Sequence, residues 1–149
     1  MRSSGHRASV AAMTGEQHVA MLCREHSIRR TVAEGRGRAR VRERHIQHPP
    51  IRTEMAYFVA LHEIGHIIVG LEGSRLEREA ACWDWAIEHA LVRPHYSTRQ
   101  RICACLVRYL ARARTRRWKI PGPGSRYWDL LAWWSPVFYL SSMPQSTEG

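Results

Sequence analysis

A helical segment that sets two histidines and a glutamate among apolar residues constrains this chain most. The sequence HEIGH at 62–66 lies within the largely apolar stretch 55–69, a pattern typical of a buried helix. Side chains at i and i+4 share one helix face, with Cβ atoms roughly 5–6 Å apart. Two imidazoles and a carboxylate buried without partners cost several kcal/mol, whereas a metal ion satisfies all three. The HExxH spacing therefore predicts a zinc site, with His62 and His66 as ligands and Glu63 addressing a water molecule.

The residues after the motif decide the third protein ligand, since a catalytic zinc takes three protein ligands and keeps one position for water. The spacing HExxHxxGxxH is excluded because Gly70 lies four residues beyond His66 and no histidine follows at the required place. The next predicted helix offers Glu77 and Glu79. Helical phase sets Glu79 on the apolar face of that helix and Glu77 on its polar face. We therefore predict Glu79 as the third ligand, with Glu77 as the alternative.

Hydrophobic periodicity elsewhere predicts a single α+β domain at 15–140, between a flexible N-terminus at 1–14 and a flexible C-terminal tail at 141–149. Alternation within 31–46 predicts a strand, and the turn residues at 34–37 predict a hairpin. The expected sheet is small and antiparallel, and it packs on the HExxH helix. Helices are predicted at 15–26, 53–69, 74–92 and 97–114. The segment at 121–139 is rich in turn and aromatic residues, and it is predicted to cover the core.

Composition gives weaker information about partners and location. The chain of 149 residues carries a net charge of +10, with a single lysine among its 23 basic residues. Such a charge attracts anionic partners, nucleic acid among them, but no known nucleic-acid-binding pattern accompanies it. The four cysteines form no CxxC pair, and no apolar run of about 20 residues occurs. We expect a cytoplasmic protein that does not associate with membranes.

One known family combines these features. HEIGH followed by Glu79-x-x-Cys82-x-x-Trp85-Ala86 resembles the motifs of the ImmA/IrrE metallopeptidases, a gluzincin family of phages, mobile elements and bacteria. The resemblance covers about residues 31–91, with Cys82 where the family usually has alanine; a second alignment puts Glu77 on the family glutamate. It implies a zincin-like fold, His62, His66 and Glu79 as zinc ligands, and Glu63 as general base or acid. Family members often cleave a helix-turn-helix repressor, which implies such a partner here.

The expected activity is hydrolysis of a peptide bond in a regulatory protein. Zinc lowers the pKa of bound water and polarises the carbonyl, while Glu63 transfers the proton. The arginine-bearing strand at 38–44 is a possible docking edge for acidic peptides, and His89, His95 and Tyr96 are possible oxyanion donors. Two alternatives stay open: a non-catalytic regulatory module that binds a repressor, and a basic nucleic-acid-binding module in which HEIGH is accidental.

Overall fold

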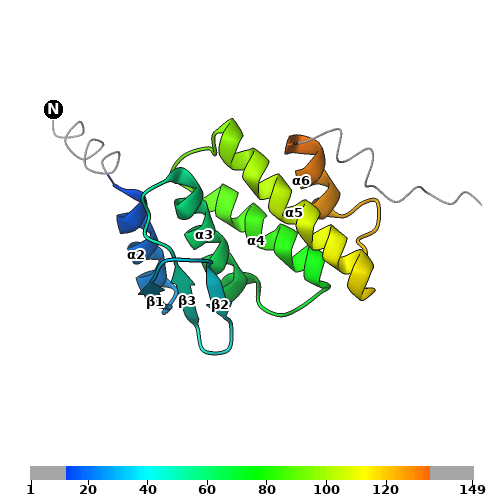
Figure 1. The fold of residues 1–149 in the computed structure, drawn as a ribbon. Coiled ribbons are helices and arrows are strands. Elements are labelled where there is room, and N and C mark those ends of the chain that lie inside the picture. The colour runs from blue at the N-terminus through cyan, green and yellow to red at the C-terminus, as the bar shows by residue number, and fades with distance from the viewer. Residues whose placement is uncertain (1–12, 135–149) are drawn as a thin grey trace, which may run out of the picture.

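In the α+β fold of this chain a long central helix lies between a small sheet and a group of further helices (Figure 1). The computed structural model describes residues 13–134. Helix α2 and the sheet contact one part of α3, and α4 and α5 contact another, while α6 packs on α4 and α5. In chain order the elements are α2 (Gly15–Glu25), β1 (Arg29–Val32), β2 (Arg38–Arg40), β3 (His45–His48), α3 (Glu54–Val69), α4 (Arg75–His89), α5 (Tyr96–Arg116) and α6 (Arg126–Trp134).

The helix ends are formed by the residues that the sequence predicts. Thr53 caps α3, because its hydroxyl accepts a hydrogen bond from the Ala56 amide at 3.1 Å. Gly70 closes the same helix with a positive φ of 79°, a conformation that glycine adopts without strain. The first helix begins at Gly15 as predicted, and its N-cap Thr14, which forms a capping box with Gln17, is the last residue of the N-terminal segment predicted to be flexible. The rest of that prediction, at 1–12, and the predictions for 135–149 lie outside the described residues.

The sheet differs from the predicted antiparallel hairpin. Its strand order is β1-β3-β2, with β1 parallel and β2 antiparallel to β3. The turn at 34–37 joins β1 to β2, which are not neighbours, and the hairpin turn lies at 41–44. Buried Ile46 and His48 explain the central position of β3, because this strand carries the apolar face that packs on α3. Alternation persists within β2, where Arg38 and Arg40 are exposed.

Helix α6 replaces part of the turn-rich segment predicted at 121–139. Tyr127, Trp128 and Leu131 from this helix are fully buried in the core. The Trp128 indole donates a hydrogen bond to the Pro121 carbonyl at 2.9 Å, and the Tyr127 hydroxyl donates one to the Leu106 carbonyl. The predicted role of this segment in covering the core is therefore confirmed for residues 127–131, but it is performed by a helix. Predicted contributions from Phe138 and Tyr139 lie outside the described residues.

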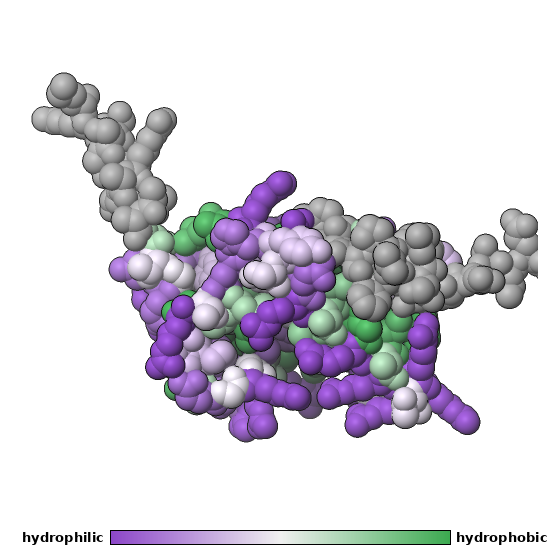
Figure 2. All heavy atoms as spheres, turned by 45° about the horizontal axis from the view of Figure 1, so that its top comes forward, coloured by the Kyte–Doolittle hydropathy of each residue, from purple (hydrophilic) through white to green (hydrophobic). Residues whose placement is uncertain are grey.

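Exposed arginines dominate the charged surface, and hydrophilic side chains project widely from the face drawn in Figure 2. Ion pairs hold some of them, among them Arg30 with Glu16 and Arg52 with Glu34. The 13 carboxylate residues cannot neutralise 23 basic ones, so the surface keeps a positive charge. Among residues 13–134, no helix combines the length and apolarity needed to cross a membrane.

The backbones of α3 and α4 approach each other closely at Gly65. A Cβ atom at this position would lie 2.9 Å from the carbonyl oxygen of Cys82 and 3.3 Å from its Cα. Both atoms belong to the α4 backbone, which cannot rotate away as a side chain would. Glycine in mid-helix costs about 1 kcal/mol relative to alanine. The close contact between the two helices explains why glycine occurs here.

Gly65→Ala is expected to lower the free energy of unfolding by about 1–3 kcal/mol, because the overpacking between α3 and α4 outweighs the gain in helix propensity. Urea unfolding followed by circular dichroism measures the change. Gly122→Ala is the matched control, since a Cβ there meets no atom within 4 Å. A Gly65→Ala variant as stable as the wild type would contradict the close approach.

Candidate metal centre

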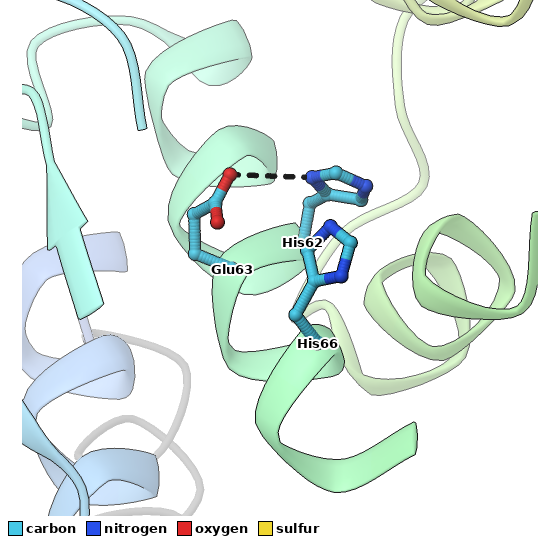
Figure 3. A group of neighbouring side chains, drawn as sticks. All are labelled: His62, Glu63 and His66. Carbon is cyan, nitrogen blue, oxygen red and sulfur yellow. Dashed lines mark ion pairs between the residues drawn. The ribbon is translucent and has the colours of Figure 1, made fainter. Parts of the chain in front are cut away.

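The imidazoles of His62 and His66 lie one turn apart on the same face of α3 (Figure 3). Their ring centroids are 4.6 Å apart, and His62 is buried. Trp83 of α4 stacks on the His62 ring, with centroids 3.9 Å apart and planes 17° from parallel. The Cys82 sulfur lies 3.4 Å from Nδ1 of His66. These two neighbours from α4 restrict the orientation of both rings, and the Nε2 atom of each is directed at a carboxylate.

That carboxylate belongs to Glu79, also on α4. Oε1 of Glu79 lies 2.9 Å from Nε2 of His62, and Oε2 lies 3.2 Å from Nε2 of His66. Glu79 is buried, with 5% of its surface exposed, as its helical phase predicts. Glu77 is half-buried and forms no ion pair within residues 13–134. The structure therefore brings Glu79, and not Glu77, to the two histidines.

Glu63 lies beside the two histidines but contacts a different nitrogen. Its Oε1 is 3.5 Å from Nδ1 of His62, the contact drawn in Figure 3. The β1–β2 connection covers this carboxylate, because a Cβ at Gly37 would lie 2.9 Å from Oε1 of Glu63. Glycine at position 37 thus lets the connection approach Glu63 closely. Possible ligand atoms of His62, Glu63 and His66 all lie within 4.8 Å of one another, so this group is able to hold a metal ion.

Burial and charge act in opposite directions on the pKa values of this group. Burial alone would lower the pKa of His62, but the Glu79 and Glu63 carboxylates raise it to about 9. Burial alone would raise the pKa of Glu79, but the two histidines hold it well below its usual range. Without a metal, His62 therefore carries a proton near neutral pH and pairs with an ionised Glu79. Metal binding has to displace that proton.

One orphaned atom tests whether these side chains fit a metal. Nε2 of His62 is fully buried and forms no hydrogen bond with a described residue, although Oε1 of Glu79 is only 2.9 Å away. The pair is close without the alignment of a hydrogen bond. Two imidazole nitrogens and a carboxylate that converge in this way form a donor set suited to zinc and to several other transition metals. The residues therefore fit a metal ion, and the donor set alone does not identify it.

A cleft of about 500 Å³ opens onto this group. The β1–β2 connection, α3, α4 and α5 supply its walls. Tyr109 of α5 lines it, and burial together with the Glu79 and Glu63 charges raises the pKa of its hydroxyl to about 12. Tyr109 therefore stays protonated and able to donate a hydrogen bond at neutral pH. The lining residues are Gly35, Arg36, Gly37, Pro49, Thr53, Met55, Ala56, Val59, His62, Glu63, Glu79, Trp83, Arg101, Cys105, Arg108, Tyr109 and Arg112.

The three residues predicted as oxyanion donors lie outside this cleft. His89 stacks on Trp85, His95 pairs with Glu54, and Tyr96 is exposed. Tyr109 lines the cleft instead, and sequence analysis did not single it out as a site residue, although its helical phase predicts that it faces inward. Phase alone does not tell which buried group an inward side chain meets.

Comparisons of this chain with protein-family models, with curated proteins and with solved structures give no match. The resemblance to the ImmA/IrrE metallopeptidases stays a prediction from the motifs. Any functional proposal therefore rests on the geometry of the centre and of its cleft.

The raised pKa of His62 predicts a pH dependence of stability in protein stripped of metal by a chelator. The ion pair with Glu79 stabilises the fold fully below the unfolded-state pKa of about 6.5, and this contribution is lost as pH rises through about 9. Urea unfolding at a series of pH values should show stability falling across this window. Glu79→Gln should weaken the decline, because it removes the larger of the two carboxylate charges that raise the pKa of His62. A flat profile for the stripped wild type would show that His62 is not held protonated.

Proposed function

We propose that this chain is a zinc-dependent metallo-endopeptidase of the ImmA/IrrE type, with His62, His66 and Glu79 as metal ligands. The single observation that supports it best is the convergence of two Nε2 atoms on one buried carboxylate, at distances of 2.9 and 3.2 Å. Glu63 lies 3.5 Å from Nδ1 of His62 and not at the Nε2 atoms that face Glu79, so in this proposal it serves in proton transfer and not as a ligand. Three protein ligands with a nearby carboxylate form the arrangement of a catalytic rather than a structural zinc site.

Glu63 is the general base and acid in this proposal. Bound zinc would lower the pKa of a water molecule towards 7 and polarise the scissile carbonyl. The Glu63 carboxylate accepts the proton of the attacking water and then delivers it to the leaving amine. Its position in the wall of the cleft, covered by Gly37, restricts solvent on one side.

Tyr109 stabilises the developing negative charge on the carbonyl oxygen in this mechanism. Its hydroxyl lines the same cleft as Glu63 and Glu79, and its raised pKa keeps it a donor. A donor fixed in a partly desolvated cleft stabilises an oxyanion more strongly than water does.

An extended peptide is the substrate that suits this cleft. β2 is an edge of the sheet within residues 13–134, and it begins at Arg38, directly after the cleft residue Gly37. A peptide added to this edge forms main-chain hydrogen bonds and leads into the cleft. The motif resemblance suggests a helix-turn-helix repressor as the protein that carries the scissile bond.

Metal content tests the ligand set. Purified wild type should hold one zinc per chain by elemental analysis, and His66→Ala or Glu79→Ala should lose it, because each removes one of three ligands. Glu77→Ala is the matched control on the same helix and should keep the metal. Circular dichroism verifies that every variant is folded. A folded wild type that takes up no zinc after remetallation would exclude the proposal, and retention by Glu79→Ala with loss in Glu77→Ala would reassign the third ligand.

Activity tests the roles of the two cleft residues. Glu63→Gln should retain zinc and lose peptide hydrolysis, because the amide cannot accept the proton. Tyr109→Phe should lower kcat by about 10²-fold with little change in KM, because its hydrogen bond forms in the transition state. Both rates are measured by mass spectrometry of cleavage products from a peptide library or a repressor substrate.

Two further results separate the proposal from the alternatives. A repressor bound but never cleaved by the zinc-loaded protein would favour the non-catalytic regulatory module. Tight nucleic-acid binding that falls steeply with salt and is indifferent to His62→Ala would favour the basic binding module.

A further inference from the structure

Four arginines surround the cleft that opens onto the metal group. Arg101, Arg108 and Arg112 extend from one face of α5, at positions i, i+7 and i+11, and Arg36 lies in the β1–β2 connection. All four are exposed residues, and all four line the cleft.

These charges have no neutralising partner within the cleft. The only acidic residues that line it are Glu63 and Glu79, which belong to the metal group. None of the four arginines forms an ion pair with any residue from 13 to 134, in contrast to Arg30 and Arg52. Outside the metal group, the charged residues that line the cleft are therefore all positive. A concave site with such a rim focuses the field and attracts ligands of opposite sign.

Two of the arginines are held against the wall of the cleft. The Arg108 guanidinium donates a hydrogen bond to the Cys105 sulfur at 3.3 Å, and the Arg112 guanidinium lies 6.0 Å from the Tyr109 ring centroid. Both contacts are with residues that line the cleft. The first contact holds Arg108 at Cys105, and the second places the Arg112 guanidinium over the ring of Tyr109, the oxyanion donor of the proposed reaction.

We infer that the cleft selects peptides with acidic side chains on both sides of the scissile bond, bound by Arg36, Arg101, Arg108 and Arg112. This inference rests on the proposed function, since it names the substrate class of the same site. Arg101 and Arg112 are separated by about 16 Å along the axis of α5, the length of about five residues of extended peptide. Acidic residues about two positions before and after the scissile bond therefore reach arginines at both ends of the row. Arginine forms paired hydrogen bonds with carboxylates, which adds geometric selectivity to attraction.

The shape of the cleft favours a peptide over nucleic acid. Its volume of about 500 Å³ lies in the range of sites for small ligands or short segments. Apolar Val59 and Trp83 line it beside the metal group, where they suit a substrate with apolar parts. Nucleic acid binds along grooves that follow many phosphates, whereas these arginines line a single hollow. The arginine row predicted at 38–44 contributes none of its members to the cleft lining.

Binding by the Glu63→Gln protein tests the inference without depending on hydrolysis. Two fluorescein-labelled peptides of about nine residues, identical except for glutamate or glutamine at four positions, are compared by fluorescence anisotropy. The glutamate peptide should bind about tenfold more tightly at low salt, because several rim charges add their attraction. The triple variant Arg101→Gln/Arg108→Gln/Arg112→Gln should lose most of this preference and keep only the share of about twofold that the remaining Arg36 supplies.

A charge-matched control separates the cleft from the general basicity of the chain. It exchanges three exposed basic residues outside the cleft for glutamine, namely Arg24, Arg93 and Lys119. This control should keep the preference for the glutamate peptide. Arg36→Gln alone, on a different wall, should reduce the preference about twofold, which provides a second test should the triple variant fold poorly.

Three results would overturn the inference. The first is equal affinity of the Glu63→Gln protein for the two peptides, and the second is a control variant that loses the preference as much as the triple variant does. The third is a labelled single-stranded DNA of about twelve nucleotides that binds the cleft more tightly than the glutamate peptide does. Cleavage of a peptide library by the zinc-loaded wild type tells the two proposals apart. Cleavage that depends on Glu63 but shows no preference for acidic peptides would support the proposed peptidase function and overturn the inference. Selective binding of acidic peptides without any cleavage would support the inference and count against the peptidase function.

Discussion

The close contact between α3 and α4 at Gly65 is the constraint on which the candidate centre depends. A Cβ there would meet the Cys82 carbonyl at 2.9 Å, so only glycine lets the two backbones approach so closely. This approach brings Glu79 within 2.9 and 3.2 Å of the two Nε2 atoms and stacks Trp83 on His62. A wider separation would leave a buried carboxylate without a partner, at a cost of several kcal/mol.

The same packing places charged side chains in the interior, and their burial by itself lowers the stability of the fold. Two carboxylates and a raised-pKa imidazole lie within an apolar core, where each ion loses its hydration. Fully buried residues around them, such as Phe58, Leu61 and Ile64 on α3, supply the hydrophobic stabilisation that offsets this loss. Buried ionisable groups with strongly shifted pKa values that face a cleft are typical of functional sites.

The cleft unites segments that are distant in sequence, and each contributes different chemistry. The β1–β2 connection brings Gly37 onto Glu63, while α5 brings Tyr109 and a row of arginines. In the functional proposals α3 and α4 supply the metal ligands, and α3 also supplies Glu63 for proton transfer. Oxyanion stabilisation comes from α5, and substrate selection comes from α5 together with the β1–β2 connection. Helix α6 supports this arrangement indirectly, because the Tyr127 hydroxyl bonds to the Leu106 carbonyl of α5.

The sequence by itself determined what depends on near neighbours: the caps at Thr53 and Gly70, the shared face of His62 and His66, and the inward phase of Glu79. These follow from helical periodicity, which is a local property. Only the tertiary structure decided the strand order, because pairing of β3 between β1 and β2 depends on which strand packs its apolar face on α3. It also decided that Tyr109 and the α5 arginines share a cleft with Glu63. Periodicity gives the face of a helix on which a side chain lies, but the packing of elements far apart in the chain decides what that face meets.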